Sequence, residues 1–273
     1  MTDLAGSPLG HAATYREHYD PSLLFPVERA PLRATLGIAA PLPFHGEDVW
    51  TAHELSWLDA SGKPQIGVAT LRVPAQSPCI VESKSVKLYL TSFNQTSFES
   101  AQAMRGTIAR DLGAATGSEV VVELATPEAF STLPRAEPDG VCLDDLPLLV
   151  RDETLSPDAL RCGRTEVRET VFTRLFRSVC PVTGQPDYAT VVVTYAGRAI
   201  EHAGLLRYLV SFRRQPGFHE HCVETIFVDL IRRCVPDELH VHARFARRGG
   251  IDINPYRSTT VLPHPVNART ATQ

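Results

Sequence analysis

A cysteine and an aspartate on either side of a turn sequence are the residues with the clearest chemical potential. Cys180 and Asp187 flank PVTGQP, in which Pro and Gly are typical of a turn between two strands. Closing a hairpin over this turn returns its two ends to neighbouring positions. A thiolate is a nucleophile and a carboxyl group can donate a proton, so the spacing predicts covalent acid–base chemistry. The alternative is a buried strand cysteine beside a turn aspartate.

A second group of residues lies in the sequence ESKSVKLYL. Glu82 or Ser83 can cap a helix that begins here. Free backbone N–H groups at a helix start bind phosphate, and Lys84 adds positive charge. Lysine is rare in this chain: the lysines are Lys63, Lys84 and Lys87, and arginine accounts for the remaining Lys and Arg residues. We therefore predict a phosphate-binding helix start, with a capped surface helix as the alternative.

Histidines and a cysteine gather in FHEHC (218–222) and HVH (240–242). These side chains are of the types that bind zinc, but their spacing matches no compact zinc motif, and we predict no metal. His219 and Glu220 begin a predicted helix and are suited to hold a polar ligand. A carboxylate at this point can accept two N–H bonds from the edge of a guanine-like ring.

The elements that position these residues occur twice in the chain. LYLTSF (88–93) matches RYLVSF (207–212), and GKPQIGVATLRV matches GQPDYATVVVTY, at a spacing of roughly 120 residues. In the second copy two strands precede helices at about 201–213 and 219–234, and a strand follows at 238–246. Antiparallel strands with helices on one face predict an α+β fold. At this spacing Cys180 aligns with Leu58 and Asp187 with Gln65, so the copies differ in their chemistry.

The repeat divides the chain into four predicted parts. They are an N-terminal arm (1–45), a first module (46–125), a proline-rich linker or excursion (126–165) and a second module (166–273). The first module carries the helix start at Lys84, and the second carries Cys180 and Asp187.

Composition narrows the functional classes. The net charge of −4 argues against nucleic-acid binding. No apolar run approaches the roughly 18 residues of a membrane span, and the N-terminal sequence does not resemble a secretory signal. We expect a cytoplasmic protein whose six cysteines are free thiols.

Four segments together resemble the QueF nitrile reductases, which are NADPH-dependent 7-cyano-7-deazaguanine reductases of queuosine biosynthesis. The segments are ESKSVKLYLTSFNQTSF (82–98), SVCPVTGQPDYATV (178–191), LRYLVSFRRQPGFHEHCVETIFVDL (206–230) and RRGGIDINPYR (247–257). The resemblance covers nearly the whole chain and fits the long, two-module form of the family.

The resemblance implies a fold, a reaction and two catalytic residues. The fold would be tandem tunnelling-fold modules of ββααββ order, which assemble into a homodimer. The reaction would reduce the nitrile of 7-cyano-7-deazaguanine to the primary amine of 7-aminomethyl-7-deazaguanine, with two NADPH consumed in each turnover. Cys180 would attack the nitrile carbon to form a thioimide, and Asp187 would supply protons.

The resemblance also implies binding residues and partners. The substrate would contact Val81, Glu82, Ser83, His219 and Glu220. NADPH would contact Ser83, Lys84, Arg248 and Gly249. No metal, nucleic acid or membrane would take part. Two other classes remain open from the residues alone: a metal-dependent cyclohydrolase of the same fold, and a non-catalytic tandem binding protein.

Overall fold

The computed structural model describes residues 15–148 and 154–273, and these form two compact units. Unit 1 comprises the described part of Met1–Ala39 together with Glu47–Pro134 and Arg247–Ile253. Unit 2 comprises Ala40–Gly46, the described part of Arg135–Ala246 and Asn254–Gln273. Parts of the predicted arm (1–14) and of the predicted linker (149–153) lie outside the described residues.

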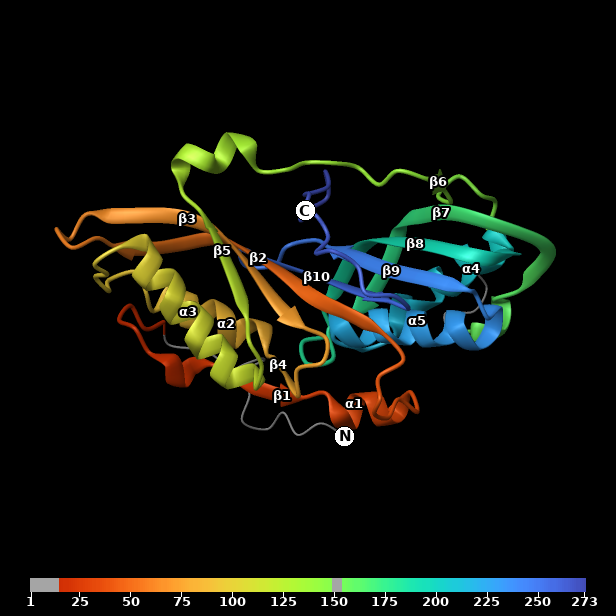
Figure 1. Ribbon diagram of the computed structural model, residues 1–273, viewed down its shortest axis with the longest axis horizontal. Helices are drawn as coiled ribbons and strands as arrows, with labels where there is room; N and C mark the ends of the chain where they lie inside the picture. Colours follow the sequence, from red (N-terminus) through yellow and green to blue (C-terminus); the bar gives the residue numbers. More distant parts are fainter. Residues whose placement is uncertain (1–14, 149–153) are drawn as a thin grey trace. The chain divides into compact units, whose positions relative to one another are not determined.

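Unit 1 contains an antiparallel sheet with strand order β5-β3-β2, a short strand pair and three α-helices (Figure 1). The sheet strands are β2 (His45–Leu58), β3 (Pro64–Pro74) and β5 (Val121–Ala125), and the pair is β1 (Pro26–Glu28) with β4 (Cys79–Val81). The helices are α1 (Ala30–Thr35), α2 (Ser83–Thr91) and α3 (Ala101–Thr116), and short 3₁₀ turns occupy Pro21–Leu23 and Pro127–Thr132.

The sheet strands of unit 2 follow the order β6-β7-β8-β9-β10 (Figure 1). These strands are β6 (Val141–Cys142), β7 (Cys162–Val179), β8 (Pro186–Ile200), β9 (Glu238–Phe245) and, from Asn254 onward, β10 (Ile251–Ser258), antiparallel except for β6 with β7. The helices are α4 (His202–Val210) and α5 (His219–Cys234), with 3₁₀ turns at Pro157–Ala159 and Ser211–Arg214. The structure is therefore a mixed α+β fold rich in antiparallel sheet, as predicted.

The helix predicted over 219–234 is confirmed as α5, and its sequence pattern explains its position. Val223, Ile226, Phe227 and Leu230 recur at helical spacing and are fully buried. This apolar stripe packs α5 against the sheet, in contact with β9 (Figure 1). The charged residues Arg232 and Arg233 fall in the last turn, where positive side chains interact favourably with the helix dipole.

The predicted repeat is confirmed by matching side-chain contacts inside the two units. In unit 1 the hydroxyl of Tyr89 donates to Asp111 Oδ2 at 2.7 Å. In unit 2 the hydroxyl of Tyr208 donates to Asp229 Oδ2 at 2.6 Å. Each bond joins the first long helix of its unit to the second, so the same buried link holds both helix pairs. Burial raises the pKa of both tyrosines, which keeps them protonated as donors.

Two further matched positions continue this pattern. Ser92 and Ser211 each donate a side-chain hydrogen bond of 2.6 Å to the carbonyl oxygen of the tyrosine three residues earlier. Phe93 and Phe212 each lie edge-on to that tyrosine, with ring centroids 5.1 and 5.4 Å apart. The short sequence matches therefore correspond to the same structure at the C-terminal ends of α2 and α4.

The proline-rich region between the copies belongs to unit 1 as far as Pro134, and its described residues from Arg135 onward belong to unit 2. The strand β6 lies inside the predicted linker and pairs with β7 at Val171 and Phe172. The strand β7 also begins at Cys162, several residues before the predicted start of the second module. Conversely, Arg247–Ile253 lies in the sequence assigned to the second module and belongs to unit 1.

The described part of the N-terminal arm packs within unit 1 as far as Ala39, whereas residues 40–45 belong to unit 2. Tyr19 places its ring edge-on to Phe93 at 5.5 Å, and its hydroxyl donates to Asp111. Arg29 forms a buried ion pair with Asp48 at 2.6 Å. These contacts join the arm to α2, α3 and β2. No helix among the described residues is long and apolar enough to cross a membrane.

The helix α5 ends in an unfavourable backbone conformation. Val235 has φ 47° and ψ 55°, and it is the only described residue other than glycine with a positive φ. A β-branched side chain is strained in this left-handed region, where glycine is the usual residue. The Val235 side chain is 68% exposed, so it contributes little to the core.

Replacing Val235 by glycine should therefore stabilise the protein. We expect the free energy of unfolding to rise by about 1 kcal/mol, because the strain at the helix end is removed. Urea denaturation followed by circular dichroism measures this change. Val261 is also exposed and lies outside helices and strands, so Val261→Gly is a matched control that should give no increase. A loss of stability in Val235→Gly would contradict the prediction.

Candidate functional site

Cys180 and Asp187 lie at the hairpin that joins β7 to β8. The Cys180 N–H donates to the Gln185 carbonyl oxygen at 2.8 Å, and the Gly184 N–H donates to the Cys180 carbonyl oxygen at 3.1 Å. Asp187 pairs directly with Ser178, two residues before Cys180. Cys180 and Asp187 are thus diagonal neighbours on one face of the hairpin rather than direct partners. Both are buried, with 8% and 4% of their surface exposed.

The structure corrects the sequence alignment of the two hairpins by one residue. Leu58 pairs with the segment 96–98, and Val179 pairs in the same way with the segment 215–217. Val179 is therefore the counterpart of Leu58, and Cys180 is the counterpart of Asp59. The alignment of Cys180 with Leu58 was wrong because the turn of unit 2 is one residue longer: Leu58 pairs with Pro64 and Val179 with Pro186.

The corrected alignment indicates that a side chain at the Cys180 position can reach one at the Asp187 position. In unit 1 the Gln65 side-chain amide donates to Asp59 Oδ2 at 2.9 Å. Gln65 pairs with Trp57 as Asp187 pairs with Ser178. Ser61 donates to the same carboxylate from its hydroxyl and its N–H, and these and other hydrogen bonds lower the pKa of Asp59. Unit 1 therefore has a closed structural turn where unit 2 has a thiol and a carboxyl group.

His219 brings an imidazole to this hairpin from the first position of α5. Its Nε2 atom lies 3.5 Å from Asp187 Oδ2. The ring stacks on Phe245 of β9, with centroids 3.8 Å apart and planes 7° from parallel. Its buried Nδ1 atom has no hydrogen-bond partner within the described chain. The next residue, Glu220, is 4% exposed.

Unit 2 holds four of the predicted site residues, of which Asp187 and His219 lie next to each other. Cys180 directly follows β7, Asp187 lies at the start of β8, and His219 and Glu220 lie in the first turn of α5. The arrangement holds a thiol, a carboxyl group and two further polar side chains that can orient a ligand. Sequence reasoning missed Phe245, whose apolar strand position gave no sign of its contact with His219.

The start of α2 collects four predicted residues in unit 1. Val81 ends β4 and is buried, and Glu82 is the N-cap of α2. The Lys84 N–H donates to Glu82 Oε1 at 2.7 Å, and the Ser85 N–H donates to Oε2 at 2.8 Å. Burial raises the pKa of Glu82, whereas these N–H bonds lower it. The predicted cap is confirmed and is Glu82, which leaves Ser83 exposed at the first helical position.

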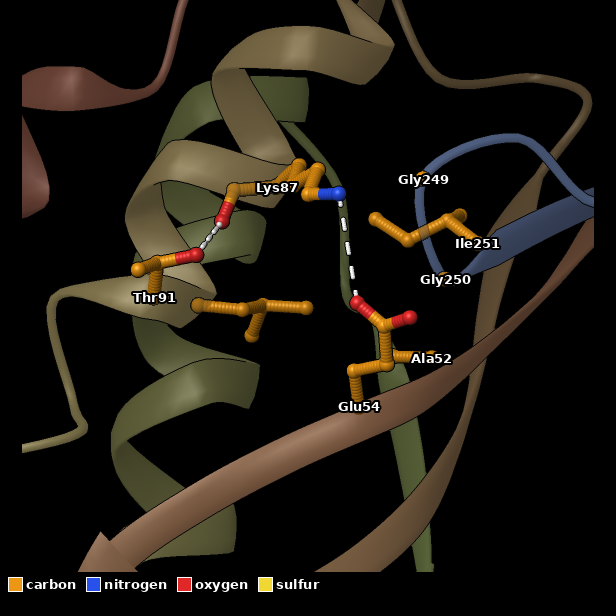
Figure 2. A pocket seen from close by; sticks show the side chains of 8 residues that line it. Ala52, Glu54, Lys87, Thr91, Gly249, Gly250 and Ile251 are labelled. Atoms are coloured by element: carbon orange, nitrogen blue, oxygen red, sulfur yellow. Dashed lines mark hydrogen bonds and ion pairs between the residues drawn. The ribbon is translucent and has the colours of Figure 1, made fainter. Parts of the chain in front are cut away.

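A double-glycine turn beside α2 carries the other predicted binding residues. Arg248 and Gly249 are exposed, and Gly249 and Gly250 have φ values of 60° and 81°. A Cβ atom on Gly249 would lie 2.7 Å from the amine of Lys87, and one on Gly250 would lie 2.5 Å from the Glu54 carboxylate. Figure 2 shows the Lys87 amine directed toward Glu54, 3.9 Å away, beside this turn. The positive φ values favour glycine at both positions, whereas the flexible ends of the Lys87 and Glu54 side chains can shift away from an added Cβ atom.

Lys87 is a residue that the sequence singled out without placing it. It follows Lys84 by one helical turn, so both lysines point to the same side of α2. Lys87 and Gly249 are far apart in the sequence but close in space. Residue spacing in the sequence could not have indicated this contact.

The other histidines and cysteines of the sequence cluster have different environments. Burial lowers the pKa of His242 to about 3 and raises the pKa of Cys222 to about 12. Both groups are therefore neutral at neutral pH. Over residues 15–148 and 154–273, no three His, Cys, Asp or Glu side chains gather as a metal site requires.

Comparison with known families matches both halves of the chain. Residues 15–124 match the family described as nitrile reductase, 7-cyano-7-deazaguanine-reductase N-term. Residues 186–262 match the family described as QueF-like protein.

The sequence is also similar to full-length relatives. It is 56% identical over 269 residues to the NADPH-dependent 7-cyano-7-deazaguanine reductases of Burkholderia pseudomallei and Burkholderia mallei, covering 98% of each chain. It is 55% identical to that of Burkholderia thailandensis, again with 98% of each chain covered. A crystal structure of the archaeosine synthase QueF-Like in the apo form matches 37% of this chain and 99% of its own, at 18% identity and a TM-score of 0.32.

Proposed function

Since this chain belongs to the family of NADPH-dependent 7-cyano-7-deazaguanine reductases, we propose that it reduces 7-cyano-7-deazaguanine to 7-aminomethyl-7-deazaguanine in queuosine biosynthesis. The identity of 56% over 98% of the chain supports this activity. The observation that carries the residue assignment is the meeting of Cys180, Asp187 and His219 at one hairpin of unit 2.

Cys180 acts as the nucleophile in the proposed mechanism. Its sulfur adds to the nitrile carbon, and one π bond of the C≡N triple bond is broken. The nitrogen takes a proton, which gives a thioimide with a C=N double bond. A thioimide accepts hydride more readily than a nitrile, so covalent catalysis replaces one difficult step by easier ones. NADPH supplies hydride when bound, and two NADPH and two protons convert the nitrile to the primary amine.

Asp187 supplies protons to the substrate nitrogen. Its position, diagonal to Cys180 on the hairpin, supports this assignment, since the corresponding pair of side chains in unit 1 is in contact. His219 lies beside Asp187 at 3.5 Å and can orient it or pass a proton to it.

Substrate recognition is assigned to Val81, Glu82, Ser83, His219 and Glu220. The buried carboxylate of Glu220 and the imidazole of His219 are suited to the polar edge of the deazaguanine. Glu82 already accepts two backbone N–H bonds, so we propose that it shapes the α2 start around the ligand as well as contacting it. Loss of this cap would misplace Ser83 and Lys84.

NADPH binding is assigned to Ser83, Lys84, Arg248 and Gly249. Ser83 is exposed at the helix start, where Glu82 already accepts the N–H groups of Lys84 and Ser85, and the double-glycine turn lets a ligand approach the backbone. Lys84, Lys87 and Arg248 add positive charge around these groups. The residues present therefore fit a phosphate-bearing cofactor.

We propose that the two copies are tandem tunnelling-fold modules, at 46–125 and 166–273, with 1–45 as an arm and 126–165 as an excursion. The element order β2-β3-α2-α3-β5 in unit 1 and β7-β8-α4-α5-β9-β10 in unit 2 supports this fold. Residues of both units serve one reaction, and a homodimer is the proposed assembly. A reducing cytoplasm is the proposed location, consistent with six free cysteines.

The direct test is adduct formation with 7-cyano-7-deazaguanine. Mixing the purified protein with this compound in the absence of NADPH should produce a new absorbance band and a mass increase equal to that of the substrate. Addition of NADPH should then remove the adduct and release the amine, with two NADPH oxidised per amine formed. A protein that neither forms the adduct nor oxidises NADPH would overturn the proposal.

A variant of Lys84 tests the cofactor assignment. Lys84→Ala should raise the KM for NADPH by about 10- to 150-fold, the effect of losing a charge-assisted contact of roughly 1.5–3 kcal/mol. The thioimide should still form, since nucleophilic attack precedes hydride transfer. Lys63→Ala removes an exposed lysine from the same unit and should leave both the KM for NADPH and thioimide formation unchanged. Loss of the adduct with unchanged NADPH affinity would move Lys84 to the substrate side.

A further inference from the structure

A pair of cysteines lies at the far ends of β7, which leads to Cys180, and of α5, which begins at His219. Cys162 is the first residue of β7, and Cys234 is the last residue of α5. The Cys162 thiol lies 3.9 Å from the carbonyl oxygen of Cys234, and the two thiols are near enough to influence each other's ionisation. Cys162 is partly exposed, whereas only 1% of the Cys234 surface is accessible.

Neighbouring contacts hold these two chain segments together. Arg233, next to Cys234, forms an ion pair with Asp158 in the 3₁₀ turn that precedes β7. The Glu201 N–H donates to the Arg161 carbonyl oxygen at 2.9 Å, which ties the residue before Cys162 to the start of α4. The proximity of the two cysteines is therefore supported by the local structure on both sides.

We propose that Cys162 and Cys234 are an oxidation site, at which a reversible disulfide joins the start of β7 to the end of α5. A disulfide requires Cβ atoms about 3.5–4.5 Å apart, and the Cys162 sulfur already lies 3.9 Å from the backbone of Cys234. Disulfides of this kind in reducing compartments are transient and respond to oxidants. The proposal is independent of the catalytic assignment, because neither cysteine takes part in it.

The chemistry is thiol–disulfide exchange with a low-molecular-weight disulfide such as oxidised glutathione. The Cys162 thiolate attacks one sulfur of the reagent, an S–S bond forms, and the first glutathione leaves as a thiolate that takes a proton. Cys234 then loses its proton and attacks the Cys162 sulfur, which releases the second glutathione. The two protein thiols are oxidised and the reagent is reduced to two thiols, so atoms and electrons balance.

Exposure and acidity set the order of these steps. Burial, followed by the interaction with Cys162, raises the pKa of Cys234 to about 12, and the charge of Arg198 opposes this shift. Cys234 is therefore protonated and shielded, and the partly exposed Cys162 reacts first. Cys234 has the role of the resolving thiol, next to the sulfur that it attacks.

The bridge would stabilise unit 2 without blocking the catalytic thiol. The strand β7 leads from Cys162 to Val179 and so to Cys180, while α5 leads from His219 to Cys234. The 16 residues of α5 span about 24 Å, so the bridge lies at the opposite end of the helix from His219. Closing the long loop between the two cysteines removes conformational freedom from the unfolded chain.

The test incubates the full-length protein with oxidised glutathione, blocks remaining thiols by alkylation and maps the peptides by mass spectrometry. We expect a peptide pair linked through Cys162 and Cys234, which a reductant separates. The oxidised protein should show a Tm higher by roughly 5 °C or more. The linked peptides and the change in Tm are measured without nitrile or NADPH. Their outcome therefore does not depend on whether the proposed reaction is correct.

Two variants make the outcome decisive. In Cys234→Ser the glutathione adduct should persist on Cys162, since the resolving thiol is absent, and the Tm increase should vanish. Cys79→Ser removes another partly exposed cysteine and should leave the bridge unchanged. A persistent Cys162–glutathione adduct in the unmodified sequence, or oxidation that links only other cysteines, would overturn the proposal.

Discussion

Replacing Cys180 by alanine or serine should abolish both thioimide formation and turnover. Alanine has no nucleophile, and a serine hydroxyl at this position lacks the readily formed anion of a thiol. Intact-mass measurement of the protein with 7-cyano-7-deazaguanine should show the unmodified mass in both variants. NADPH oxidation should fall to the rate observed without enzyme.

Two other cysteines of unit 2 provide the control. Cys222 and Cys234 lie on α5 and are buried, and burial raises the pKa of each to about 12. Each therefore remains a thiol at neutral pH, so Cys222→Ala and Cys234→Ala should keep both the adduct and substantial activity. An adduct of the substrate mass in Cys180→Ala would show that another residue is the nucleophile.

The second large effect is expected from Asp187→Asn. Asparagine keeps the shape of the side chain but cannot donate the carboxyl proton, so kcat should fall by about 10²- to 10⁴-fold. The KM for the nitrile substrate should rise much less, since ground-state contacts are retained. Steady-state kinetics over a range of pH measures both values.

Asp59→Asn is the matched control for this variant. Asp59 lies at the corresponding turn of unit 1, where it accepts hydrogen bonds from Ser61 and Gln65. Its replacement should lower stability slightly and leave kcat unchanged. An Asp187→Asn enzyme with normal kcat across pH would exclude Asp187 as the proton donor and favour His219, 3.5 Å away, in that role.

The local elements of this protein could be predicted from its residue patterns. The apolar stripe of 219–234 predicts the helix that is observed as α5, because burying that stripe is the main source of its stability. PVTGQP predicts the turn between β7 and β8, since Pro and Gly fit its backbone. The matched Tyr, Ser and Phe of LYLTSF and RYLVSF predict a repeat, and these side chains form the same contacts in both units.

Some features depend on contacts between residues far apart in the chain. The stacking of His219 on Phe245 and the approach of Lys87 to Gly249 arise from the packing of α5 on β9 and of a glycine turn beside α2. Local periodicity reports only which face of an element is buried, and not which side chain of another element it meets. The same reason hides the contact of Cys162 with Cys234, which sequence reasoning treated as separate free thiols.

The candidate site residues could therefore be identified from the sequence, whereas their spatial arrangement could be determined only from the folded structure. Cys180, Asp187 and Lys84 are recognisable because their types and neighbours suit nucleophilic attack, proton transfer and phosphate binding. The exact counterpart of Cys180 in the first copy was not readable, since an additional turn residue shifts the alignment from Leu58 to Asp59. Strand register is set by backbone pairing across the hairpin, and only the tertiary structure contains that pairing.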